Sequence, residues 1–160
     1  MGVGFGGYFL FEQKTSTYPS LGLYINSDFH FQIQLPNEST SGTYSPVIYS
    51  AGNGDTGISF NKSNLNLKYF NSIIISKNIC QKGDVVFIGD TSFVRNTELS
   101  TEVGISNVSF EGFYCIENDG LSYTLIFDQK YIKGSPALDE IATLQKFEQE
   151  LKILKIQFIN

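Results

Sequence analysis

The alternation of apolar and polar residues is the feature that most constrains how this chain can fold. In residues 28–35, DFHFQIQL, the apolar side chains of Phe29, Phe31, Ile33 and Leu35 are separated by polar ones. A period of two places the apolar side chains on one face of an extended strand and the polar ones on the other. The same pattern recurs along most of the chain, with aromatic and β-branched residues that suit pleated surfaces. It predicts a fold dominated by strands.

Turn residues between the apolar runs favour antiparallel pairing of these strands. Gly89-Asp90 separates two alternating runs, and Asn118-Asp119-Gly120 separates two more. Asn, Asp and Gly tolerate the positive φ angles that tight hairpin turns require. Residues 36–63 are rich in Gly, Ser, Asn and Thr, and we expect a long loop there with only two short strand candidates. Such a loop is a natural binding surface.

The pattern changes near the C-terminus. Five apolar residues recur there at steps of three and four: Leu138, Ile141, Leu144, Phe147 and Leu151. This spacing predicts a helix over about 136–152 with one face turned to a core, with Ser135 as its N-cap and Pro136 at its first position. Residues 153–160 return to alternation. They predict a final strand, or alternatively a helix that continues to the end as a dimerising segment.

These patterns together predict an α+β fold that is strand-dominated. We expect an antiparallel β-sheet or sandwich with one long C-terminal helix and a final strand. A chain of 160 residues suits a single domain, 1–160, because single cores commonly run to about 100–200 residues.

Acidic residues are concentrated in the middle of the chain. The net charge is −5, yet seven acids and a single basic residue, Arg95, lie between positions 84 and 119. The acids are Asp84, Asp90, Glu98, Glu102, Glu111, Glu117 and Asp119. We expect a basic protein partner, because complementary fields speed association and suppress wrong partners. Direct binding to nucleic acid is disfavoured, because phosphates are recognised by clustered Lys and Arg.

The sequence has no recognisable catalytic, metal-binding or cofactor-binding motif. Gly2, Gly4 and Gly7 match the spacing of a dinucleotide-binding loop, but only Met1 precedes them and a strand pattern follows. That fingerprint needs a strand before the glycines and a helix after them. The single histidine, His30, falls on the polar face of its predicted strand. We therefore expect a non-catalytic protein with no cofactor and no metal.

The two cysteines and the N-terminus bear on the compartment. Cys80 and Cys115 lie in apolar, strand-like surroundings, where buried inert thiols are the usual interpretation. A disulfide between them becomes possible if the protein is exported. No run of apolar residues is long enough to span a membrane, and no basic residue precedes the first apolar stretch as in a signal peptide. The sequence thus predicts a cytoplasmic protein without a membrane partner.

Two hypotheses of function follow. The first is a non-catalytic protein-binding inhibitor, such as a bacterial immunity protein that neutralises a basic toxin or nuclease. The alternative is a carbohydrate- or receptor-binding β-sandwich module of a surface or phage protein. Tyr44 and Tyr49 lie among Ser, Gly and Asn in the predicted loop, a composition that binding loops favour. The same tyrosines could instead pin the loop to the core.

Overall fold

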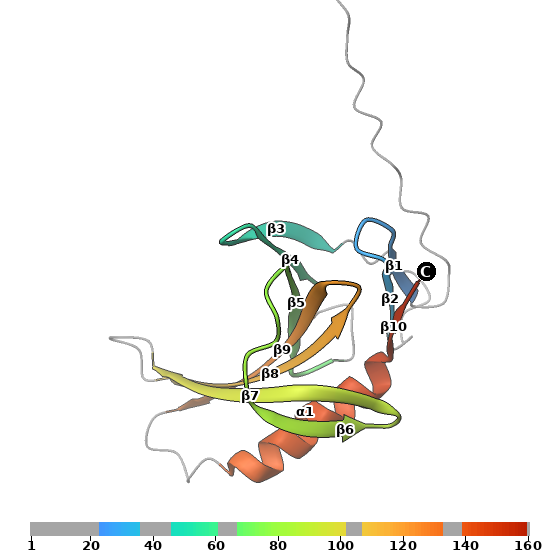
Figure 1. Ribbon diagram of the computed structural model, residues 1–160. Helices are drawn as coiled ribbons and strands as arrows, with labels where there is room; N and C mark the ends of the chain where they lie inside the picture. Colours follow the sequence, from blue (N-terminus) through green and yellow to red (C-terminus); the bar gives the residue numbers. More distant parts are fainter. Residues whose placement is uncertain (1–22, 36–45, 61–66, 102–106, 133–138, 160) are drawn as a thin grey trace, which may run out of the picture.

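The computed structural model describes residues 23–35, 46–60, 67–101, 107–132 and 139–159. The elements in chain order are β1 Leu23–Asn26, β2 Phe31–Gln34, β3 Val47–Gly52, β4 Asp55–Ser59, β5 Phe70–Ser76, β6 Asp84–Ile88, β7 Thr91–Thr101, β8 Asn107–Asn118, β9 Leu121–Ile132, α1 Glu140–Leu154 and β10 Ile156–Phe158 (Figure 1). This confirms the predicted strand-dominated α+β fold with one helix near the C-terminus and a final strand.

The strands form two antiparallel sheets. The larger sheet has seven strands in the order β3-β4-β5-β9-β8-β7-β6, and the smaller has the order β1-β2-β10. The predicted turns are confirmed: Gly89 (φ 62) lies between β6 and β7, and Asp119 (φ 49) and Gly120 (φ 74) join β8 to β9. β5 and β6 are neighbours in the chain but lie four strands apart in the sheet. Residues 77–83 therefore cross the large sheet, in front of β8 and β9 in Figure 1.

Aromatic side chains join the two sheets in a sandwich-like core. The alternation predicted over residues 28–35 is confirmed from Phe31 onward, where Phe31, Ile33 and Leu35 are all buried, whereas Phe29 is half-buried in the turn before β2. The ring centroid of Phe31 lies 5.7 Å from that of Tyr123 in β9. Tyr123 in turn lies 4.9 Å from Phe158 in β10 and donates its hydroxyl proton to the Phe29 carbonyl at 2.8 Å. The Phe31–Tyr123 pair is edge-to-face, and ring pairs in this arrangement contribute to stability beyond the area that they bury.

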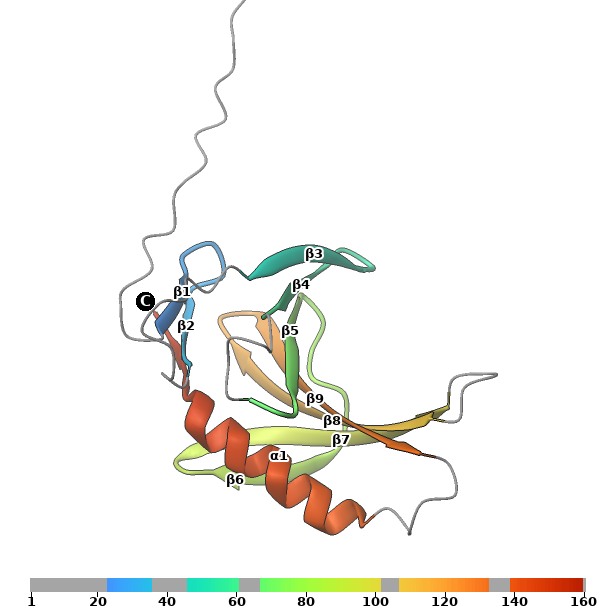
Figure 2. The same ribbon diagram turned by 180° about the vertical axis from the view of Figure 1, so that it is seen from behind.

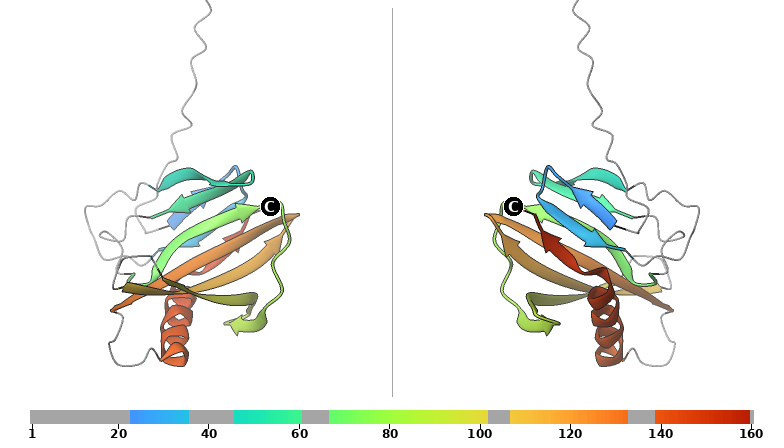
Figure 3. Two further views of the ribbon diagram at one scale, coloured as in Figure 1. Left: turned by 90° about the vertical axis from the view of Figure 1, so that its left-hand side faces the viewer. Right: turned by 90° about the vertical axis from the view of Figure 1, so that its right-hand side faces the viewer.

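Helix α1 covers the same face of the large sheet, across β6 to β9 (Figures 2 and 3). Its central contact is Phe147, which is fully buried and stacks on Phe110 and Phe127, with ring centroids 6.1 and 5.7 Å away. A Cβ atom at Gly112 would lie only 2.8 Å from the Phe147 ring. The glycine is therefore required for the close approach of the helix to β8.

The helix differs from its prediction at both its start and its buried face. Its N-cap is Asp139, whose side chain accepts the N–H of Ala142 at 3.0 Å, so that the predicted cap at Ser135 was wrong. Ser135 and Pro136 themselves lie outside the described residues. The buried side chains are Thr143, Phe147, Glu150, Leu151 and Leu154, and Ile141 is 73% exposed. The buried face of the helix therefore includes two polar residues, Thr143 and Glu150, and excludes Ile141.

The predicted loop over 36–63 is a hairpin in its described part. β3 and β4 pair from Val47↔Ser59 to Gly52↔Asp55 and are joined through Gly52, Asn53 and Gly54, which all have positive φ. Asn-Gly is a strong signal for a tight hairpin turn, but the many polar residues around it favoured a loop interpretation. Residues 36–45 and 61–63 lie outside the described residues.

Candidate functional site

The predicted acidic residues do not share one face of the molecule. Strands in register place alternate residues on opposite sides of a sheet. The large sheet has an inner face, which the helix and the small sheet cover, and an outer face opposite to it. Asp84 lies on the inner face, Glu98 and Glu111 on the outer face, and Asp90 and Asp119 in hairpin turns. Glu102 lies outside the described residues.

Asp84 belongs to a structural ion-pair network on the inner face. Arg95 in β7 donates to the Asp84 carboxylate at 3.2 Å and to Glu148 of the helix at 2.8 Å. Burial opposes the charged form of Arg95, but the two hydrogen bonds outweigh it and raise the pKa of the guanidinium. Burial also raises the pKa of the adjacent Tyr114 phenol, and Glu148 adds to the rise. Asp84 and Glu148 therefore help attach the helix to β6 and β7.

Glu117 holds the crossover segment, residues 77–83, against β8. Its carboxylate accepts the backbone N–H of Cys80 at 2.7 Å. Cys80 also forms a disulfide with Cys115, with the Cα atoms 5.8 Å apart. The prediction of two inert thiols was wrong, because the crossover brings together two cysteines that are 35 positions apart. Gly83 ends the segment close to β7, where an added Cβ would lie 2.4 Å from the Arg95 carbonyl oxygen.

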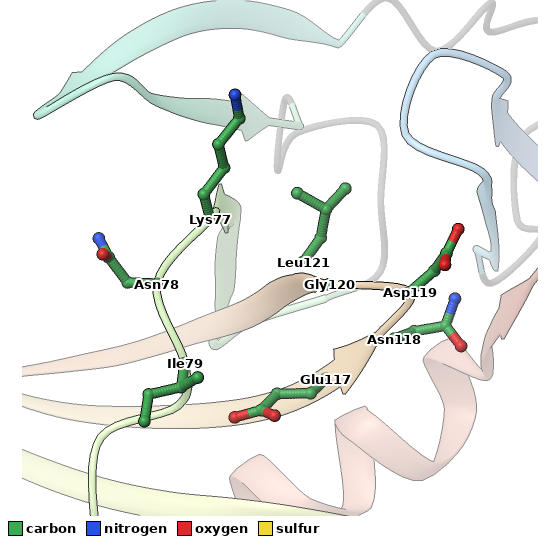
Figure 4. Close-up of a pocket in the computed structure, with 8 residues that line it drawn as sticks. All are labelled: Lys77, Asn78, Ile79, Glu117, Asn118, Asp119, Gly120 and Leu121. Carbon is green, nitrogen blue, oxygen red and sulfur yellow. The ribbon is translucent and has the colours of Figure 1, made fainter.

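A hollow of about 240 Å³ lies between the crossover and the end of the β8–β9 hairpin (Figure 4). Its lining includes Lys77, Ile79, Glu117 and Asp119. Glu117 is already bonded to the crossover backbone, and Asp119 points away from the crossover in Figure 4. The position of Asp119 at the turn is explained by its φ of 49, which Asp tolerates. Both residues thus have structural roles here.

A second hollow, of about 350 Å³, lies beside the β6–β7 turn. Its lining combines Asp90 of that turn with Phe93 of β7 and with Leu151, Lys152 and Lys155 at the end of the helix. Lys152 and Lys155 are in the last helical turn and at its C-cap, where cations are stabilised by the helix dipole. In the described part of the chain, no group of three or more His, Cys, Asp or Glu residues could hold a metal ion.

The outer face carries a row of three carboxylates across adjacent strands. Glu98 of β7 lies directly opposite Glu111 of β8, and Glu111 lies directly opposite Asp128 of β9. Burial raises the pKa of Glu111, and the charges of Glu98 and Asp128 raise it further. Like charges directly opposite one another destabilise a sheet. We name Glu98, Glu111 and Asp128 the carboxylate row.

Of the two candidate tyrosines and the single histidine, Tyr49 and His30 have structural roles and Tyr44 lies outside the described residues. Tyr49 of β3 is paired with Gly57 of β4, and its ring lies where a Cβ of Gly57 would be. It packs on its own hairpin and remains 40% exposed. Tyr44 lies outside the described residues, as do Gly2, Gly4 and Gly7. His30 occupies the turn between β1 and β2 with a φ of 50, not the polar face of a strand.

Sequence reasoning missed three acidic residues with clear roles. Asp128 completes the carboxylate row, Glu148 pairs with Arg95, and Glu150 accepts three backbone N–H groups from residues 68–70. Glu150 could have been noticed, because it lies three positions after Phe147 and one before Leu151, on the apolar side of the helix. Asp128 gave no such signal, because its neighbours in space are set by strand order.

Comparison with known proteins adds one distant likeness. No known family matches the chain, and no curated protein matches it. A crystal structure of a protein from Bacteroides thetaiotaomicron VPI-5482, at 1.50 Å resolution, is similar with a TM-score of 0.48 and 13% sequence identity. The match covers 89% of this chain and 50% of that one, so that the chain spans about half the length of the other protein. A likeness of this size carries no argument about function.

Proposed function

We propose that this protein is a non-catalytic binding module that presents the outer face of β7, β8 and β9 to a basic protein partner. The observation that carries the proposal is the carboxylate row, in which Glu98 and Glu111 face each other on a side of the sheet that the helix does not cover. Burial and the charges of Glu98 and Asp128 raise the pKa of Glu111, and a positively charged partner segment would offset the repulsion among the three carboxylates. The toxin-neutralising inhibitor suggested by the sequence is one form of this function.

The row is a better candidate than the whole acidic segment. Asp84 already forms an ion pair with Arg95, and Glu117 already accepts a hydrogen bond from the Cys80 backbone. A partner that bound either carboxylate would have to break these interactions. Glu98 is exposed and Glu111 is half-buried, so that both carboxylates can be reached from the outer face. Charges at such positions act mainly on the association rate and on its dependence on salt.

We also propose that the protein acts in an oxidising compartment. No helix in the described ranges is long and apolar enough to cross a membrane. The Cys80–Cys115 disulfide favours an oxidising compartment over the cytoplasm predicted from the sequence, because cytosolic thiols are kept reduced. The carbohydrate-binding alternative stays a prediction, since Tyr44 lies outside the described residues and Tyr49 packs on Gly57.

The test is to capture the partner and then to reverse the row. The tagged protein is exposed to an extract of its own cells, and a captured basic protein is purified for association-rate measurements at low and high salt. The Glu98→Lys/Glu111→Lys double variant should associate at least about tenfold more slowly at low salt, and the difference should shrink at high salt. Asp28→Lys is a charge-reversal control away from the row, because Asp28 is exposed in the turn between β1 and β2. Equal rates for the double variant and the control would refute the proposal.

A further inference from the structure

The edge of the large sheet at β6 exposes apolar side chains. β6 pairs only with β7, so that its other edge has no partner strand within the described residues. Val85 is 63% exposed and Phe87 is 73% exposed, and their spacing of two puts both on the outer face. Ile79, on the crossover that leads into β6, is 80% exposed. Exposed apolar clusters of this kind commonly mark contact surfaces.

β6 has few of the features that protect free edges. Natural edge strands are blunted by a bulge, a proline, a lysine, an inward-pointing charge or a very short length. Of these, β6 has a length of five residues and one inward-facing carboxylate, Asp84, which is paired with Arg95. The sequence of β6, DVVFI, has neither proline nor lysine, and its register with β7 is regular through all five pairs. The opposite edge, β3, is interrupted by an irregularity between Ser50 and Gly52. The free edge of β6 is thus regular along its whole length, whereas the regular pairing of β3 ends at Ser50.

The strand is complementary to itself in one antiparallel register. With Val86 opposite Val86 of the second copy, each Val85 faces Phe87 of the second copy on the outer side. Pairs of an aromatic and a β-branched residue stabilise antiparallel strands. Each Asp84 faces Ile88 of the second copy, so that the two Asp84 positions lie about 14 Å apart along the strand direction, given about 3.4 Å per residue. This separation exceeds the screening length at physiological salt, and the two carboxylates do not oppose pairing.

We propose that β6 is a homodimer interface, in which the strand pairs antiparallel with β6 of a second copy and continues the large sheet through a two-fold axis at Val86. Such an interface is isologous, with the same surface contributed by both copies. The inference is independent of the proposed function, because the carboxylate row lies on β7 to β9 and stays exposed in the dimer.

The test is the mass of the protein in solution, measured by light scattering and sedimentation over a range of concentrations. The wild type should have twice the mass of one chain, and Phe87→Lys should be monomeric because it places a charge opposite Val85 of the second copy. Val85→Lys serves as a second disrupting variant should Phe87→Lys fail to fold. Val47→Lys, which alters an exposed residue of the other edge strand, should remain dimeric.

The register has its own test. Only the register centred on Val86 brings the two copies of that residue opposite each other, so that Val86→Cys should form a covalent dimer under mild oxidation. A wild type that is monomeric up to about 0.1 mM would overturn the proposal. A dimer that survives both lysine substitutions in β6 would also overturn it, since the interface would then lie elsewhere.

Discussion

The buried carboxylate of Glu150 offers the sharpest test of how the helix is attached to the sheet. Its two oxygens accept the backbone N–H groups of Lys68, Tyr69 and Phe70 at 2.6, 3.0 and 2.9 Å. These three residues lead into β5, and the Tyr69 carbonyl also accepts the N–H of Asp128 in β9 at 2.9 Å. Glu150 is only 8% exposed. It therefore takes the place of water as the acceptor for these amides.

The magnitude follows from these three bonds. A hydrogen bond to a charged group contributes about 1.5–3 kcal/mol. Lys68 is exposed, so that its amide can bind water when the carboxylate is removed. The loss of stability therefore comes from the two bonds to the amides of Tyr69 and Phe70. Relief of the cost of burying a charge offsets part of this loss. We expect Glu150→Ala to lower the free energy of unfolding by about 3–4 kcal/mol, or the Tm by roughly 10 °C for a chain of this size.

The measurement is urea unfolding followed by circular dichroism, with thermal unfolding as a second readout. Glu150→Gln should lose about 2 kcal/mol, because it keeps one acceptor but turns an NH₂ donor toward a backbone N–H. Gln149→Ala is the control, because it changes an exposed neighbour on the same helix and should stay within about 0.5 kcal/mol of the wild type. If Glu150→Ala matched Gln149→Ala, the amides of residues 68–70 would not depend on this carboxylate.

Two further predictions concern the outer face and the crossover. The folded state raises the pKa of Glu111 above its ordinary value of 4.5, so that it binds a proton more tightly than the unfolded chain, and stability falls as the pH rises through this window. Glu111→Gln should therefore be more stable than the wild type at neutral pH, with no gain below about pH 4; a gain that is the same at every pH would contradict the electrostatic cause. Replacing Cys80 and Cys115 together by Ala should lower the free energy of unfolding by about 3–4 kcal/mol, because the disulfide closes a loop of 35 positions. Dithiothreitol should destabilise the wild type by a similar amount and leave the double variant unchanged, and a wild type insensitive to reduction would refute this.

The carboxylate row connects stability with the proposed function. The carboxylate row destabilises the sheet, and this is compatible with a binding surface. Residues that favour binding of a partner often reduce the stability of the fold. If Glu111→Gln gained stability and lost association rate with a basic partner, both effects would come from the Glu111 charge, which is half-buried and repelled by Glu98 and Asp128 within the fold and which a basic partner would attract. A gain in stability with unchanged association would leave the row as a feature of the fold only.

The local parts of this fold were predictable from the sequence. The alternation in residues 28–35 identified Phe31, Ile33 and Leu35 as buried, because the period of a side-chain pattern reports the local backbone geometry directly. The turns at Gly89 and at Asp119-Gly120 were predictable for the same reason, since positive φ restricts the residue type at single positions. The helix was predicted from its spacing, although Thr143 and Glu150 on its buried face escaped notice because they are polar.

The tertiary structure alone decided which distant residues meet. Strand order separates β5 from β6 and sends residues 77–83 across the outer face, and this crossing pairs Cys80 with Cys115 and gives Glu117 its backbone partner. Register across β7, β8 and β9 assembles the carboxylate row from positions that are 13 and 17 residues apart in the chain. Alternation shows which side of a strand is buried but carries no information about the neighbouring strand or its register. The sequence by itself therefore determined the elements and their faces, and long-range pairing determined the candidate site.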